Sequence, residues 1–138
     1  MTDSSAGFDV GQYLDQSSHV QAVVGMSGPT DLTVNASSGF TRAVQTAFMG
    51  FDLAKASPVT YATRDDPPFL TIQGDQDAIL TIRSGEAQEL YDCLKAAGVS
   101  AQMVVVHGGP HTLDAPDETH SRADLTRMIV DFFSQNLK

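Results

Sequence analysis

Hydrophobic residues along the chain form three short runs, each closed by residues typical of turns. The runs are Val20–Met26, Phe69–Gln73 and Gln102–His107, and they are rich in β-branched and other apolar residues. A strand that is covered on both faces has no polar alternation, so runs of this kind predict buried parallel strands. Pro67 and Pro68 stand directly before the second run, where a strand tolerates residues without a backbone donor.

Apolar residues also recur at spacings of three and four, the period of a helix with one buried face. One such stretch extends from Arg83 to Ala97 and is followed by Gly98, a residue typical of helix C-termini. A second begins near Ser121, which stands with Asp124 at the spacing of a capping box. A weaker pattern predicts a short helix at residues 41–49.

The order of these elements is strand, long connection, strand, helix, strand, helix. Right-handed crossovers between parallel strands follow from this order. The sequence therefore predicts an α/β fold, a three-layer sandwich with about three parallel strands flanked by helices. Residues 1–12 are rich in Ser, Gly and Asp without any period, and predict a loose N-terminal segment before a single domain at residues 13–138.

The amino-acid composition argues against some classes of binding partner. The chain has 138 residues, 8 Lys+Arg against 17 Asp+Glu, and a formal net charge of −9. A negative surface repels nucleic acids and anionic membranes, so neither is expected as a partner. No apolar run approaches the ~20 residues that span a bilayer, and the N-terminus lacks the pattern of a signal peptide. The chain is expected to be soluble, and the sequence leaves its location open.

The candidate chemistry lies in the two loops that follow the second and third strands. Asp77 stands in Gly74-Asp75-Gln76-Asp77, and His111 ends Gly109-Pro110-His111. Open α/β sheets hold their active sites beyond the carboxyl ends of the strands. An Asp and a His placed there correspond to the orienting acid and the base of a catalytic triad. Of the two carboxylates in the first loop, Asp75 is the better candidate for a structural role.

A nucleophile is harder to find. Gly25-Met26-Ser27-Gly28-Pro29 follows a strand, but Pro29 replaces the second glycine of a G-x-S-x-G elbow. Ser5 has no strand before it. Ser27 is therefore a weak candidate, and Ser5 a weaker one.

A metal site is an alternative interpretation of the loop before the last predicted helix, which is rich in Asp and His. Its possible ligands match no tight metal motif, and loops before helices collect such residues for capping. No metal and no other cofactor are expected. The residues concerned are His107, His111, Asp114, Asp117 and His120.

The chain resembles the C-terminal half of an esterase or lipase-type α/β hydrolase, of the acetyl-esterase and feruloyl-esterase-like branch. The resemblance covers nearly everything from residue 13 onward. The segments that carry it are Tyr13-Leu14-Asp15-Gln16-Ser17-Ser18, Val20-Gln21-Ala22-Val23-Val24, Gly28-Pro29-Thr30-Asp31-Leu32, Ala56-Ser57-Pro58-Val59-Thr60-Tyr61, Asp65-Asp66-Pro67-Pro68-Phe69-Leu70, Gly74-Asp75-Gln76-Asp77 and Gly109-Pro110-His111.

The resemblance implies that Asp77 is the triad acid and His111 the triad base. The family's first strands, oxyanion loop and elbow serine lie upstream of the segment that corresponds to Tyr13, so the chain resembles a fragment of the fold. Ser27 stands where the family carries a large residue, which argues against it as the family nucleophile.

Two hypotheses of function follow from this resemblance. In the first, the chain is a segment of an esterase that acts on carboxylic esters when a nucleophile is supplied. In the second, it is a non-catalytic remnant that associates with itself. The strand at Val20–Met26 would lack a neighbour in such a fragment, so a homo-oligomer that pairs this edge is expected.

Overall fold

The computed structural model describes residues 11–34, 43, 46–47, 52–78, 85–114 and 119–137. Three strands and the two long helices that follow them organise this part of the chain. A short helix and a 3-10 turn precede the second strand. In chain order the elements are β1 (Val23–Met26), α2 (Leu53–Ala56), η2 (Pro58–Tyr61), β2 (Phe69–Gly74), α3 (Gly85–Ala97), β3 (Ala101–Val106) and α4 (Arg122–Asn136).

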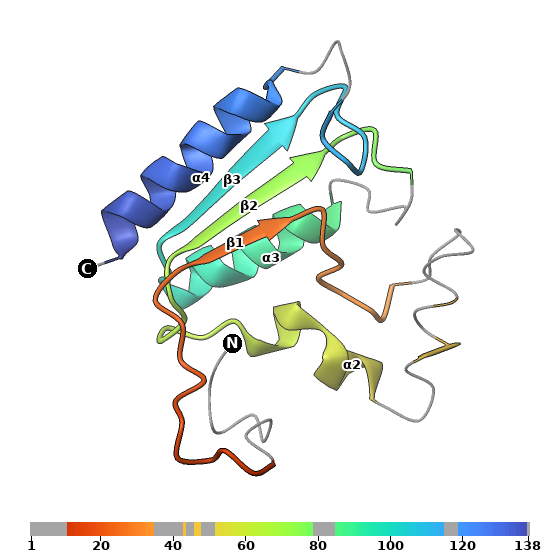
Figure 1. Cartoon of the computed structure of the whole chain (residues 1–138). Coiled ribbons are helices and arrows are strands. Elements are labelled where there is room, and N and C mark those ends of the chain that lie inside the picture. Colours follow the sequence, from red (N-terminus) through yellow and green to blue (C-terminus); the bar gives the residue numbers. More distant parts are fainter. Residues whose placement is uncertain are drawn as a thin grey trace.

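The three strands form one parallel sheet in the order β1-β2-β3. Helix α3 covers one face of the sheet and α4 lies on the opposite side (Figure 1). This arrangement confirms the predicted α/β fold with three parallel strands flanked by helices. The register places Val23 opposite Phe69 at the start of the sheet and Gly74 opposite Val106 at its end.

The core is divided by the sheet into two clusters. Leu70, Ile72 and Val106 pack with residues of α4, whereas Phe69 packs with the apolar face of α3. Every residue of β2 is buried because the strand lies between two others and is covered on both faces. The central strand thus provides a fixed base for the loop that follows it.

The ends of the two long helices follow the predicted signals. Ser121 and Asp124 form a reciprocal capping box at the start of α4. At the end of α3, Gly98 adopts a φ of 87°, and the amide of Val99 donates to the carbonyl of Leu94. This is the left-handed ending that favours glycine.

All three strands differ in their bounds from the sequence prediction: β2 ends at Gly74 instead of Gln73, and β3 begins at Ala101 instead of Gln102. The first strand begins at Val23 instead of Val20. Its first hydrogen bond with β2 runs from the Val23 amide to the carbonyl of Pro68, and Pro68 has no amide proton to donate to an earlier residue of the first strand. The third strand ends at Val106, since its register with β2 ends opposite Gly74 and His107 already belongs to a turn.

Two further sequence predictions concern residues that the structure describes only in part. Most of the predicted helix at residues 41–49 lies outside the described residues, although 43, 46 and 47 are helical. Residues 1–10 also lie outside, so the division into a loose segment and a domain stays a prediction. Among the described residues, no helix is long and apolar enough to cross a membrane.

Candidate active site

The candidate site lies at the carboxyl ends of β2 and β3, where the two following loops run against each other. Gly74 ends β2, and a Cβ atom added to it would lie 2.1 Å from the carbonyl oxygen of Gly109 in the other loop. Only a residue without a side chain permits this approach. The amide of Gln76 then donates to that same Gly109 oxygen at 3.0 Å. The backbones of the two loops are therefore in direct contact.

Asp77 and His111 are brought together across this contact. His111 Nδ1 lies 2.8 Å from Asp77 Oδ2, and the two residues are separated by 34 positions in the sequence. The Asp77 side chain is fully buried, whereas 31% of the His111 side chain is exposed. The acid is thus enclosed by protein and the imidazole is reached from solvent.

The hydrogen bond fixes the tautomer of His111. An ionised carboxylate only accepts hydrogen bonds, so Nδ1 carries the proton and donates it to Asp77. The lone pair is then on Nε2, which is the nitrogen that can take a proton from a hydroxyl or a water molecule. This is the arrangement required of a general base with an orienting acid.

Gln73 supports the acid and was not predicted from the sequence. Its Nε2 donates to Asp77 Oδ2 at 3.2 Å and to the carbonyl of Gly74 at 3.1 Å, while its Oε1 is buried without a partner. Gln73 is 1% exposed. The signal in the sequence is an amide near the end of a mostly apolar strand, where a buried polar side chain needs a partner.

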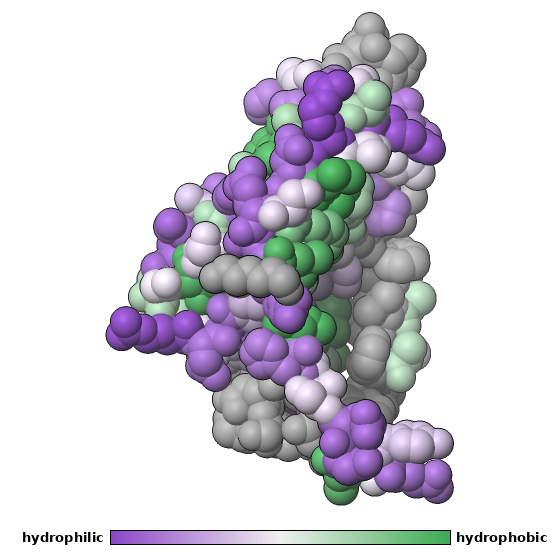
Figure 2. Space-filling view, turned by 60° about the vertical axis from the view of Figure 1, so that its left-hand side comes forward, coloured by the Kyte–Doolittle hydropathy of each residue, from purple (hydrophilic) through white to green (hydrophobic). Residues whose placement is uncertain are grey.

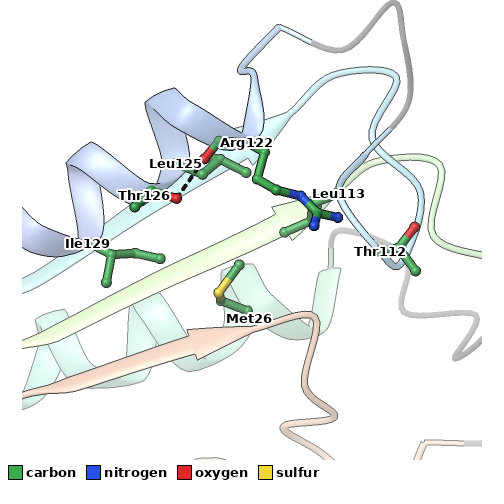
Figure 3. Close-up of a pocket in the computed structure, with 7 residues that line it drawn as sticks. All are labelled: Met26, Thr112, Leu113, Arg122, Leu125, Thr126 and Ile129. Atoms are coloured by element: carbon green, nitrogen blue, oxygen red, sulfur yellow. Dashed lines mark hydrogen bonds between the residues drawn. The ribbon is translucent and has the colours of Figure 1, made fainter.

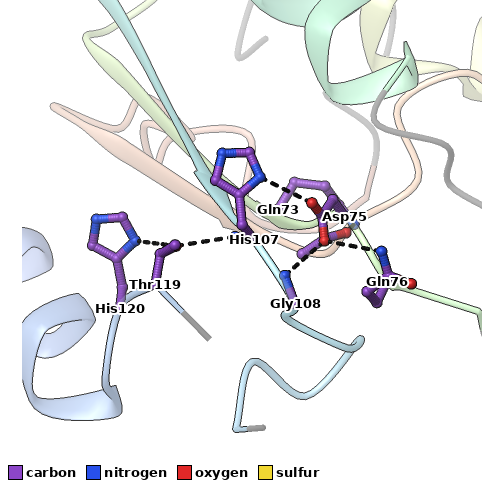
Figure 4. Close-up of polar contacts among 8 residues, drawn as sticks. Gln73, Asp75, Gln76, His107, Gly108, Thr119 and His120 are labelled. Carbon is purple, nitrogen blue, oxygen red and sulfur yellow. Dashed lines mark hydrogen bonds and ion pairs between the residues drawn. The ribbon is translucent and has the colours of Figure 1, made fainter. Parts of the chain in front are cut away.

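Asp75 forms a second acid–imidazole pair beside the first one. Its Oδ2 lies 2.9 Å from His107 Nδ1, and its Oδ1 accepts the amide of Gly108 at 2.8 Å (Figure 4). The hydrogen bond with His107, followed by the one from Gly108, lowers the pKa of Asp75 below its ordinary value. Asp75 therefore joins the two loops, which agrees with the structural role predicted for it.

Ser27 is separate from this pair. Its Oγ is buried without a hydrogen-bond partner, and its backbone adopts a φ of 46°, in the left-handed region. No serine or threonine hydroxyl among the described residues hydrogen-bonds to His111; Ser5 lies outside these residues. The geometry joins the predicted acid to the predicted base, and the Ser27 hydroxyl makes no hydrogen bond to either.

The residues considered for a metal site are engaged in different contacts. His107 and His111 pair with separate carboxylates, and Asp114 contacts Thr112 and Arg122. Within the described ranges, no group of three His, Cys, Asp or Glu side chains is arranged to hold a metal ion. Asp117 is not among the described residues.

A groove of about 300 Å³ opens next to the His111 loop, between the end of β1 and α4 (Figure 3). Met26 lines it from β1, and Leu113 lines it from the loop that carries His111. Arg122 extends across the groove from the first turn of α4. The remaining lining residues are Thr112, Leu125, Thr126 and Ile129.

Comparison with known proteins identifies the family of this chain. The BD-FAE family model matches residues 2–94, which is more than half of the chain. The match includes Asp77 and ends before His111. A search of curated proteins finds no match.

Several solved structures share the fold. A truncated carbohydrate esterase from gut microbiota is 27% identical with a TM-score of 0.68, over 94% of this chain and 47% of that one. A bifunctional GH43-CE protein of Bacteroides eggerthii is 24% identical with a TM-score of 0.68, over 94% of this chain and 18% of that one. A hormone-sensitive lipase from a metagenome library is 21% identical with a TM-score of 0.66, over 85% and 45%. This chain spans less than half the length of each.

Proposed function

The chain belongs to the BD-FAE family, and we propose that it carries the acid and the base of a carboxylic ester hydrolase, Asp77 and His111. The observation that supports this role is the 2.8 Å contact between His111 Nδ1 and the buried Asp77 carboxylate. It leaves Nε2 as the nitrogen that accepts a proton, on an imidazole that is partly exposed. The proposed substrate is a small-molecule ester.

The proposed proton transfers follow from this tautomer. His111 Nε2 takes the proton of a nucleophilic hydroxyl, whose oxygen attacks the ester carbonyl carbon. The bond to the alcohol then breaks and the imidazolium returns the proton to the departing oxygen. Water releases the acyl group by the same steps. Asp77 stabilises the imidazolium and holds its ring. A water molecule activated by His111 would hydrolyse the ester directly.

The test is hydrolysis of p-nitrophenyl acetate by the full chain. His111→Ala is compared with His19→Ala, which removes an exposed imidazole from the stretch before β1. General base catalysis contributes about 10²–10⁴-fold, so His111→Ala should lower the rate at least about 100-fold while His19→Ala leaves it unchanged. Equal slow rates in all three proteins would contradict the proposal.

The nucleophile is identified in the same experiment. Ser27→Ala is assayed beside the unchanged chain, and both are treated with a fluorophosphonate that labels activated serines. Stoichiometric labelling that disappears in Ser27→Ala assigns the nucleophile to Ser27. Hydrolysis that depends on His111 without any labelled serine assigns it to water.

A second candidate is a non-catalytic chain that associates with itself through the edge of β1. Within the described part of the chain, β1 pairs with β2 only, and Met26 at its end is 45% exposed. Figure 2 shows hydrophobic residues gathered on the face that comes forward there, from the left-hand side of Figure 1. An unpaired, apolar strand edge favours pairing with another strand, and a two-fold axis would join two copies of β1.

Self-association is tested by light scattering from low to high micromolar concentration. A dimer is expected, and Met26→Lys should shift it to monomer because a charge on a strand edge opposes pairing. Leu14→Lys changes a residue that is 65% exposed and lies outside β1, and should leave the dimer intact. A single monomeric mass at every concentration would refute this candidate.

A further inference from the structure

Two acid–imidazole pairs, not one, connect the loops after β2 and β3. Asp77 and His111 form the buried pair, and Asp75 and His107 form a second at 2.9 Å, nearer the solvent. The His107 side chain is 68% exposed and that of Asp75 is 29% exposed. The proposed function uses only the buried pair and gives the outer pair no role.

The outer pair fastens the turn that leads to His111. Asp75 contacts three consecutive residues, the last of β3 and the first two of the loop that follows: its amide donates to the carbonyl of Val106 at 3.2 Å, its Oδ2 pairs with His107, and its Oδ1 accepts the amide of Gly108 at 2.8 Å. Gly108 has a φ of 76°, which turns the chain toward His111. The direction of this turn therefore depends on the Asp75 carboxylate.

His107 also closes the far end of the same loop. Its amide donates to Thr119 Oγ1 at 3.0 Å, and its carbonyl accepts the amide of Thr119 at 3.1 Å (Figure 4). The chain leaves β3 at His107, carries His111, and returns to Thr119 just before α4. Asp75, His107 and Thr119 thus hold both ends of the loop on which the base stands.

We propose that Asp75 and His107 are positioning residues that set the contact between His111 and Asp77, an inference that rests on the proposed function of that inner pair. Two features separate this role from general stabilisation. The outer pair is exposed, and exposed ion pairs contribute little to global stability. Apart from Gln76, whose Nε2 donates to Asp75 Oδ1 at 3.4 Å, its contacts are with the residues that lead into and out of the His111 loop.

The role is tested by NMR of the imidazoles in the ¹⁵N-labelled full chain. The signal followed is the Nδ1 proton of His111, whose exchange with water is slowed while it is bonded to Asp77. Asp75→Ala should speed this exchange at least tenfold. Asp75→Asn should restore slow exchange, because the amide oxygen still accepts from Gly108. Asp65→Ala is the matched control, since Asp65 is an exposed acid at the opposite end of β2.

His107→Gln provides an independent arm in case Asp75→Ala does not fold. It removes the imidazole and keeps the backbone contacts with Thr119, so exchange at His111 should again quicken. Unchanged exchange in His107→Gln or in a folded Asp75→Ala overturns the proposal, as does an equal increase in Asp65→Ala.

These readouts do not depend on catalysis. If His111→Ala leaves ester hydrolysis unchanged while the exchange rates shift as expected, the proposed function fails and the positioning role stands. If His111→Ala abolishes hydrolysis while the exchange rates do not respond, the function stands and the positioning role fails.

Discussion

Substitution of Gly74 by alanine tests whether the contact between the two loops holds the candidate site together. The added Cβ would lie 2.1 Å from the carbonyl oxygen of Gly109 and 2.7 Å from the carbonyl oxygen of Pro110. Both neighbours are backbone atoms, so no side-chain rotation relieves the overlap. Ordinary carbon contacts begin at about 3.5 Å, and the loops must therefore separate by more than about 1 Å.

The cost has two parts. Forcing an extra carbon into packed surroundings costs about 1–3 kcal/mol. Separation of the loops also breaks the hydrogen bond from the Gln76 amide to Gly109, which is worth about 1 kcal/mol. A destabilisation of about 2–4 kcal/mol is expected in total. Because Asp77 and His111 stand three residues beyond Gly74 and two beyond Gly109, the same displacement draws the acid away from the base.

The assay is urea unfolding followed by circular dichroism, with Gly85→Ala as the control. Gly85 begins α3, and a Cβ atom added to it would have no neighbouring atom within 4 Å, so its substitution should be neutral or slightly stabilising. A free energy of unfolding for Gly74→Ala within about 0.5 kcal/mol of the unchanged chain would refute the reasoning. So would an intact slow exchange of the His111 Nδ1 proton in that variant.

Two further predictions concern other parts of the chain. Burial raises the pKa of Glu86 above its ordinary value of 4.5, so the stability that depends on its neutral form is present at low pH and is lost as the pH rises through the raised pKa. Glu86→Gln should reduce this loss of the free energy of unfolding, which is measured by urea unfolding from acid to neutral pH. An unchanged dependence of that free energy on pH would contradict the prediction. Ser27→Gly removes a buried hydroxyl and the strain of a φ of 46°, and should stabilise the chain by about 1 kcal/mol. Ser27→Ala retains the strained backbone, so it should gain less, and equal gains in the two variants would show that backbone strain is not the cause.

The pairing of Asp77 with His111 could be predicted because it depends on topology. The carboxyl ends of neighbouring parallel strands meet at one edge of a sheet, so an acid after one strand and a base after the next are brought together. The strands themselves are recognisable as apolar runs. Neither inference requires any knowledge of the detailed course of the loops.

Contacts that depend on that course could not be predicted. The Thr30 hydroxyl donates a hydrogen bond to the carbonyl of Glu86 at 2.8 Å, although the two residues are 56 positions apart in the sequence. No local sequence pattern predicts this contact. The sequence predicts His107 as the last residue of an apolar strand. The register between β3 and β2 ends one residue earlier, at Val106, so His107 lies in a turn. The left-handed backbone of Ser27 is equally hidden, since serine has no special preference for that region.

The acid–base pair and Ser27, the weak candidate for the nucleophile, are also structurally independent in this chain. Gln73, the backbone contacts of Gly74 with Gly109, and the outer pair of Asp75 with His107 all arise from β2, β3 and the loops that follow them. Ser27 lies after β1, and its hydroxyl takes no part in these contacts. The geometry of Asp77 and His111 is therefore set without it. Substitution of Ser27 should leave the exchange of the His111 Nδ1 proton unchanged, whatever it does to ester hydrolysis.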